Sequence, residues 1–218
     1  MIQMRFKLFF TLSFTLLILS SISSYAQTEK PRILFFGDSI TAGYGLEKSQ
    51  AFPALLQERV DSLNIRFDLI NGGLSGETSA GGLRRIDWML QKKVAIFVLE
   101  LGGNDGLRGI DVKDTEANLI AIIDKVRKKN PATIIILAGM QVPPNLGKEY
   151  TSAFAAIYPK IAKEKQTRLI PFLLEDVGGI PELNLPDGIH PTAQGHKLVA
   201  ETVWKYLYKE INTYYGMH

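Results

Sequence analysis

The sequence contains no cysteine, only three histidines and almost no excess of either charge. Without cysteine there are no disulfides, no thiolate metal sites, no cysteine nucleophile and no lipid attached through a thiol. The formal charge of +3 comes mostly from the N-terminus, where Arg5 and Lys7 stand in a stretch without acids. Subtracting these two cations from 25 leaves 23 basic against 22 acidic side chains, so we expect no nucleic-acid partner.

The succession of residue types in the N-terminal segment matches that of a secretory signal peptide. Arg5 and Lys7 precede an apolar run at residues 8–19, and small and polar residues follow as far as Ala26. This run is shorter than the ~20 apolar residues that a membrane-spanning helix needs, although an uncleaved anchor is the alternative. We therefore predict a signal peptide over residues 1–26, with cleavage ahead of Gln27. The mature protein is then secreted or periplasmic and has no integral membrane span.

Residues 27–218 are expected to form a single domain in which strands and helices alternate. A content of 46% hydrophobic and 22% charged residues suits one soluble domain with a full core. Strands are predicted at residues 32–36, 67–71, 94–99, 133–137 and 169–172, and helices at 52–63, 79–91, 111–129, 148–165 and 192–208. This alternation with short connections predicts an α/β fold, a three-layer α/β/α sandwich around a parallel sheet.

The first predicted strand runs directly into Gly37-Asp38-Ser39, which places a hydroxyl at the carboxyl end of that strand. Functional residues of parallel α/β sheets gather outside the carboxyl ends of the strands. The same three residue types are common in ordinary turns, so the tripeptide alone also fits a plain turn. Polar, glycine-rich segments with Gly76 and Asn104 follow the next two strands. This shared position favours a site in which Ser39 is the nucleophile.

A base for Ser39 is available near the C-terminus, in Asp187-Gly188-Ile189-His190-Pro191. Of the other two histidines, His196 falls inside the last predicted helix and His218 ends the chain. His190 precedes a proline suited to a first helical turn, so its ring is expected to project from a loop. Asp187 can orient the imidazole from three residues away, although an Asp-Gly pair also caps turns. We predict a catalytic triad of Ser39, His190 and Asp187.

Taken in order, these segments resemble the four blocks of the GDSL or SGNH hydrolases. The letters of the second name fall on Ser39, Gly76, Asn104 and His190. The likeness covers about residues 32–208, and residues 99–109 and 154–160 are especially similar to bacterial thioesterases, lysophospholipases and arylesterases of that superfamily. The resemblance implies a flavodoxin-like fold of five parallel strands and an enzyme without a metal or other cofactor.

The expected chemistry is acyl transfer through the Ser39 hydroxyl. His190 takes the proton of Ser39, and the negative charge on the substrate oxygen is then met by hydrogen-bond donors. Three donors are predicted for this oxyanion hole: the backbone N–H of Ser39, the backbone N–H of Gly76 and the side-chain amide of Asn104. Glycine at position 76 allows close approach of the backbone, and an asparagine amide donates without bringing a charge.

An acyl pocket is predicted from apolar residues in the loops after the third and fourth strands, namely Leu107, Ile110, Val142, Pro143 and Leu146. Packing of these loops on their own domain is the alternative. Because coenzyme A thioesters are cytosolic, a secreted enzyme is expected to meet lysophospholipid, fatty-acyl or aryl esters, with acyl thioester hydrolysis as a further activity. A carbohydrate O-acetylesterase would use the same machinery. We expect a monomer that acts on a small acyl ester, lipids included.

Three other classes fit the sequence less well. Phosphoryl transfer from Asp38 would require a second acid two residues later, where Ile40 stands. The α/β-hydrolase motif Gly-x-Ser-x-Gly is absent, because Ile40-Thr41 follows Ser39. A binding module without catalysis could keep the fold, yet every triad and donor position is filled.

Overall fold

The computed structural model describes residues 29–216, so the predicted signal peptide and its cleavage site lie outside the described residues. Its centre is a five-stranded sheet with the order β2-β1-β3-β4-β5, in which all neighbouring strands are parallel. The strands are β1 (Arg32–Gly37), β2 (Asp68–Gly73), β3 (Ile96–Glu100), β4 (Ile134–Ala138) and β5 (Arg168–Ile170). The predicted α/β fold with a five-stranded parallel sheet is confirmed.

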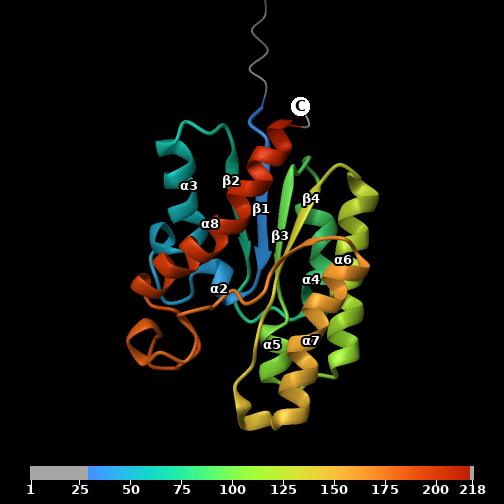
Figure 1. Ribbon diagram of the computed structural model, residues 1–218, viewed down its shortest axis with the longest axis vertical. Coiled ribbons are helices and arrows are strands. Elements are labelled where there is room, and N and C mark those ends of the chain that lie inside the picture. Colours follow the sequence, from blue (N-terminus) through green and yellow to red (C-terminus); the bar gives the residue numbers. More distant parts are fainter. Residues whose placement is uncertain (1–28, 217–218) are drawn as a thin grey trace, which may run out of the picture.

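Helices cover both faces of the sheet (Figure 1). One layer holds α3 (Phe52–Ser62) and α8 (Ala193–Gly216), which pack against each other. The other holds α4 (Ser79–Met89), α6 (Val112–Lys129) and α7 (Lys148–Glu164). The remaining elements are the short helices α2 (Ser39–Ala42) and α5 (Gly103–Leu107) and the 3₁₀ turns η1 (Lys48–Gln50), η2 (Pro144–Leu146) and η3 (Pro181–Leu183). Among the described residues, no helix combines the length and hydrophobicity needed to span a lipid bilayer.

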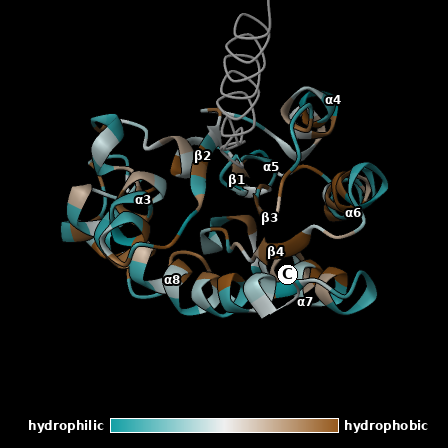
Figure 2. Cartoon of the chain, turned by 90° about the horizontal axis from the view of Figure 1, so that it is seen from above, coloured by the Kyte–Doolittle hydropathy of each residue, from teal (hydrophilic) through white to brown (hydrophobic). Residues whose placement is uncertain are grey.

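The core lies between the sheet and the two helical layers. Every residue of β3 is buried, as its continuous apolar run predicts for a strand covered on both faces. Figure 2 shows the same division on the helices, where hydrophobic residues face the sheet and hydrophilic residues face outward, most clearly on α6. Strands β1 and β3 are therefore packed between the two helical layers, and this packing fixes the positions of the residues at their carboxyl ends.

Several predicted boundaries differ from the structure, and for two of them the reason can be identified. The last helix does not end near Tyr208 but continues to Gly216, because the rings of Tyr214 and Tyr215 pack on Phe67 with centroid distances of 5.2 and 5.6 Å. Strand β5 ends at Ile170 rather than at residue 172. Pro171 follows directly, and a proline has no N–H to continue a strand ladder. The short helices α2 and α5, which start at strand ends, were not predicted.

Candidate active site

The nucleophile candidate lies at the junction between β1 and α2. Ser39 is the first residue of α2, and the side chain of Asp38 caps this helix by accepting a hydrogen bond of 3.0 Å from the backbone N–H of Ile40. Gly37 has to be glycine, because a Cβ there would overlap the hydroxyl of Thr41 and the carboxyl of Glu100. The sequence thus forces a tight turn that presents the Ser39 hydroxyl at the edge of the sheet.

The three residues of the predicted triad lie next to one another. The Oγ of Ser39 is 2.8 Å from Nε2 of His190, although 151 positions separate the two residues. On the other side of the ring, Nδ1 of His190 is 2.7 Å from Oδ2 of Asp187. An imidazole that donates its Nδ1–H to a carboxylate has a free lone pair on Nε2, which can accept the serine hydroxyl proton.

The carboxylate of Asp187 is held for this task by its own loop. Its Oδ1 accepts hydrogen bonds from the backbone N–H groups of Ile189 at 2.9 Å and His190 at 3.0 Å. Burial acts to raise the pKa of Asp187, but the hydrogen bonds from His190 and Ile189 outweigh it and lower the pKa to about 2. Asp187 is therefore ionised throughout the neutral range. The ring of Tyr44, which the sequence did not suggest, lies against the ring of His190 at a centroid distance of 4.5 Å, and the two ring planes are tilted by 39°.

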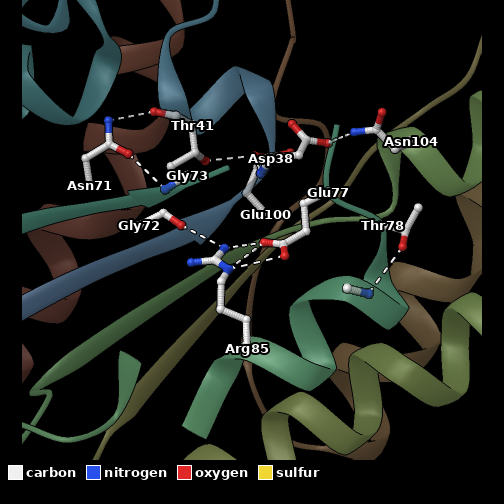
Figure 3. Close-up of polar contacts among 11 residues, drawn as sticks. Asp38, Thr41, Asn71, Gly72, Gly73, Glu77, Thr78, Arg85, Glu100 and Asn104 are labelled. Atoms are coloured by element: carbon white, nitrogen blue, oxygen red, sulfur yellow. Dashed lines mark hydrogen bonds and ion pairs between the residues drawn. The ribbon is translucent and has the colours of Figure 1, made fainter. Parts of the chain in front are cut away.

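Asn104 lies in α5, just after β3, and its side chain contacts Asp38 beside the nucleophile candidate. Gly102 adopts a left-handed φ of 112° against the hydroxyl of Tyr158, and α5 starts immediately after it. The Nδ2 of Asn104 donates a hydrogen bond of 3.1 Å to Oδ2 of Asp38 (Figure 3). An amide nitrogen carries two hydrogens, so one N–H of Asn104 remains available for a ligand. Burial raises the pKa of Asp38 to about 6, although the hydrogen bonds it accepts counteract this.

Gly76 lies in the exposed loop between β2 and α4, where its φ of 78° favours glycine. Two arginine side chains, Arg108 and Arg85, hold this loop in place. Arg108, at the end of α5, donates to the carbonyl oxygen of Gly76 at 3.1 Å, and Arg85 forms an ion pair with Glu77 while donating to the carbonyl of Gly72 (Figure 3). Within residues 29–216, the backbone N–H groups of Ser39 and Gly76 donate no hydrogen bond, which leaves both free for a ligand.

A cavity of about 410 Å³ opens beside Ser39 and His190. Three of the residues predicted to line an acyl pocket, Leu107, Val142 and Pro143, line this cavity. The wall also contains three apolar residues that the sequence did not suggest: Met140, Phe172 and Leu174. They follow β4 and β5 at the same carboxyl edge of the sheet, and this position is the signal that could have identified them.

Ile110 and Leu146 are not among the residues that line this cavity, contrary to expectation. The carbonyl of Ile110 accepts a hydrogen bond of 2.7 Å from the hydroxyl of Tyr150 on α7, so this part of the loop packs on its own domain. Leu146 lies in η2 and is partly exposed. Sequence position alone could not separate these two residues from their neighbours, because the direction of each side chain depends on how the loop folds.

This fold and site correspond to a known class of enzymes. Residues 35–198 match the model of the GDSL-like lipase/acylhydrolase family, so the chain belongs to this family. It is therefore a carboxylic ester hydrolase, as the resemblance of the sequence segments implied.

Individual relatives are similar over most of their length. The chain is 41% identical to esterase TesA of Pseudomonas aeruginosa over 86% of this chain and 91% of the relative. It is 39% identical to thioesterase 1/protease 1/lysophospholipase L1 of Escherichia coli K12, over 83% and 85% of the two chains. Among solved structures, esterase EstA from Pseudoalteromonas sp., inhibited by monoethylphosphonate, superposes with a TM-score of 0.79 at 34% identity, covering 83% of this chain and 98% of the other.

Proposed function

We propose that the protein is a secreted serine esterase that hydrolyses acyl esters through Ser39, His190 and Asp187. The observation that carries the proposal is the continuous chain from the Ser39 hydroxyl to Nε2 of His190 at 2.8 Å and from Nδ1 to Asp187 at 2.7 Å. His190 takes the proton as Ser39 attacks the ester carbonyl, and it returns that proton to the departing alcohol. Water then releases the acyl group from Ser39 by the same steps in reverse.

The transition state requires donors for the negative charge on the carbonyl oxygen. The backbone N–H groups of Ser39 and Gly76 and the second N–H of Asn104 are the proposed donors. A single donor of this kind typically contributes about 3 kcal/mol to transition-state stabilisation, comparable with a positioned general base. Asp38 supports the assignment of Asn104, since its carboxylate turns the amide by binding the first N–H at 3.1 Å.

The proposed substrates carry an acyl chain that enters the cavity beside Ser39. Its volume of about 410 Å³ and its apolar lining support lysophospholipid, fatty-acyl or aryl esters over a small polar acetyl ester. Two relatives bear the names thioesterase 1/protease 1/lysophospholipase L1 and arylesterase. Rates should be measured for p-nitrophenyl esters from acetate to palmitate. We expect an optimum beyond butyrate; an optimum at acetate with no turnover beyond butyrate would instead support a carbohydrate O-acetylesterase.

The nucleophile is tested directly by Ser39→Ala with Ser49→Ala, an exposed serine in η1, as the matched control. We expect the first variant to lose turnover while its far-UV circular dichroism is retained, and the second to keep wild-type kinetics. A fluorophosphonate probe should label the wild type on the peptide that contains Ser39, as found by mass spectrometry. Esterase activity of a pure Ser39→Ala preparation would refute the assignment.

Secretion is tested by expressing the full chain in a Gram-negative host and fractionating the cells. We expect the protein in the periplasm or medium, with Gln27 as the first residue on N-terminal sequencing. Full-length chain in the membrane fraction would support the uncleaved anchor instead.

A further inference from the structure

Glu100 is a buried carboxyl group that contacts the turn holding the candidate nucleophile. It is the last residue of β3, is 1% exposed, and pairs in register with Gly37 of β1. Its Oε2 is 3.1 Å from the backbone N–H of Asp38 and 2.7 Å from the hydroxyl of Thr41 (Figure 3). Glu100 thus binds the turn on both sides of Ser39, at the residue before it and two residues after it.

The second oxygen of Glu100 indicates that the group is not ionised. Within residues 29–216, the buried Oε1 has no hydrogen-bond partner, and no basic side chain forms an ion pair with Glu100 or Asp38. An ionised carboxylate would leave half of its charge on Oε1 without any compensation. Buried groups in this situation become neutral, because desolvation of an unpaired charge costs more than binding a proton.

The groups around Glu100 act in the same direction. Burial raises the pKa of Glu100 well above its ordinary value, and the nearby carboxylate of Asp38 raises it further. The hydroxyl of Tyr158 on α7 faces this region too, but burial raises its pKa and it donates to the carbonyl of Leu101 at 3.0 Å. The positive charge that His190 carries once it takes the Ser39 proton lowers the pKa of Asp38, which favours the negative charge on Asp38 rather than on Glu100. These effects all favour the protonated form of the Glu100 carboxyl group.

We propose that Glu100 is a neutral acid that positions the nucleophile turn and leaves Asp38 as the one charged acceptor for the Asn104 amide. Glu100 holds the N–H of Asp38, Asp38 caps α2 at Ile40, and the other oxygen of Asp38 holds Asn104. Through these hydrogen bonds, the buried Glu100 side chain fixes the positions of two proposed oxyanion donors, the Ser39 N–H and the Asn104 amide. This inference rests on the proposed function, because it concerns the positions of those donors.

The test compares Glu100→Gln with Glu100→Ala. Glutamine keeps a neutral carbonyl acceptor for the turn, so we expect kcat at pH 7 to stay within about threefold of the wild type. Alanine removes the support, and a displaced turn should lower kcat by about 10²-fold with little change in KM. Glu210→Gln is the matched control: Glu210 is also buried, but it pairs with Arg168 at 2.9 Å, at the opposite end of the sheet.

A second measurement does not depend on activity or on the folding of the alanine variant. Infrared difference spectra of the wild type minus Glu100→Gln at pH 7 should show the C=O band of a protonated carboxyl, and the Glu210→Gln difference should lack it. A folded Glu100→Gln as impaired as Glu100→Ala, or a wild type without that band, would overturn the inference. Failure of the proposed function has a different signature, namely turnover by Ser39→Ala, which says nothing about the infrared band.

Discussion

His196 is expected to make the protein less stable in acid, independently of catalysis. It lies in α8, is 1% exposed, and its Nδ1 accepts a hydrogen bond of 3.2 Å from the backbone N–H of Phe52. A protonated ring could not accept that bond. Burial, and to a smaller extent the nearby His190, lower the pKa of His196 from 6.5 to about 4.

The sign of the effect follows from which state binds the proton. Between pH 6.5 and 4, the unfolded chain protonates His196 and the folded chain does not, so acidification favours unfolding. The stabilisation is fully present above pH 6.5 and is lost as the pH falls. One pKa unit corresponds to about 1.4 kcal/mol, which gives a loss of about 3 kcal/mol in total and about 2 kcal/mol by pH 4.5.

The assay is urea unfolding of the wild type and His196→Asn, followed by circular dichroism at pH 7 and pH 4.5. The variant should be less stable at pH 7, because it loses the ring packed on Phe52, but its deficit should shrink by about 2 kcal/mol at pH 4.5. Titration of Asp187, Asp38 and Glu100 affects both proteins and cancels in the comparison. An equal deficit at both pH values would refute a buried neutral histidine. In a His190→Gln background most of the effect should persist, because burial is the larger cause.

Three further predictions concern the site. Asn104→Ala should lower kcat by about 10²–10³-fold at nearly constant KM in steady-state kinetics, and a change in KM alone would assign Asn104 to substrate binding. Val142→Trp should fill the cavity and shift the ester optimum to shorter chains, whereas Ile110→Ala, outside the cavity lining, should leave the optimum in place. Gly73→Ala should destabilise the fold by about 1–3 kcal/mol, seen as a lower Tm, because its Cβ would overlap the backbone of Ala42; an unchanged Tm would contradict this close packing.

The fold could be predicted because local signals and topology agree in this chain. The apolar run at residues 94–99 has the length and continuity of a buried parallel strand, and β3 occupies most of it. The end of α8 was predicted too early, although Gly216, where the helix ends, is a residue type common at helix C-termini. Its last two turns depend on the contacts of Tyr214 and Tyr215 with Phe67, which exist only after the chain has folded.

The candidate site was partly predictable for a similar reason. Ser39 and Asn104 each follow a strand, and parallel strands bring their carboxyl ends to one edge, so proximity follows from the fold class. Glu100 was not predicted to contribute, because in the sequence it is only a polar residue at the end of an apolar strand. Its role depends on β1 lying beside β3 with Gly37 opposite Glu100, and that register is not written in either strand alone.

The short helix α5 explains how donors from two separate loops can keep a fixed spacing. Asn104, near its start, is held by Asp38 of the nucleophile turn. The buried carboxylate of Asp105 accepts hydrogen bonds from the N–H and hydroxyl of Ser79, at 2.8 and 2.5 Å, and so fixes the start of α4. Arg108, at the other end, holds the carbonyl of Gly76 at 3.1 Å. Because one rigid turn of helix contacts both loops, displacement of α5 would move the proposed Asn104 and Gly76 donors together, and substitutions at the two should be strongly non-additive in kcat.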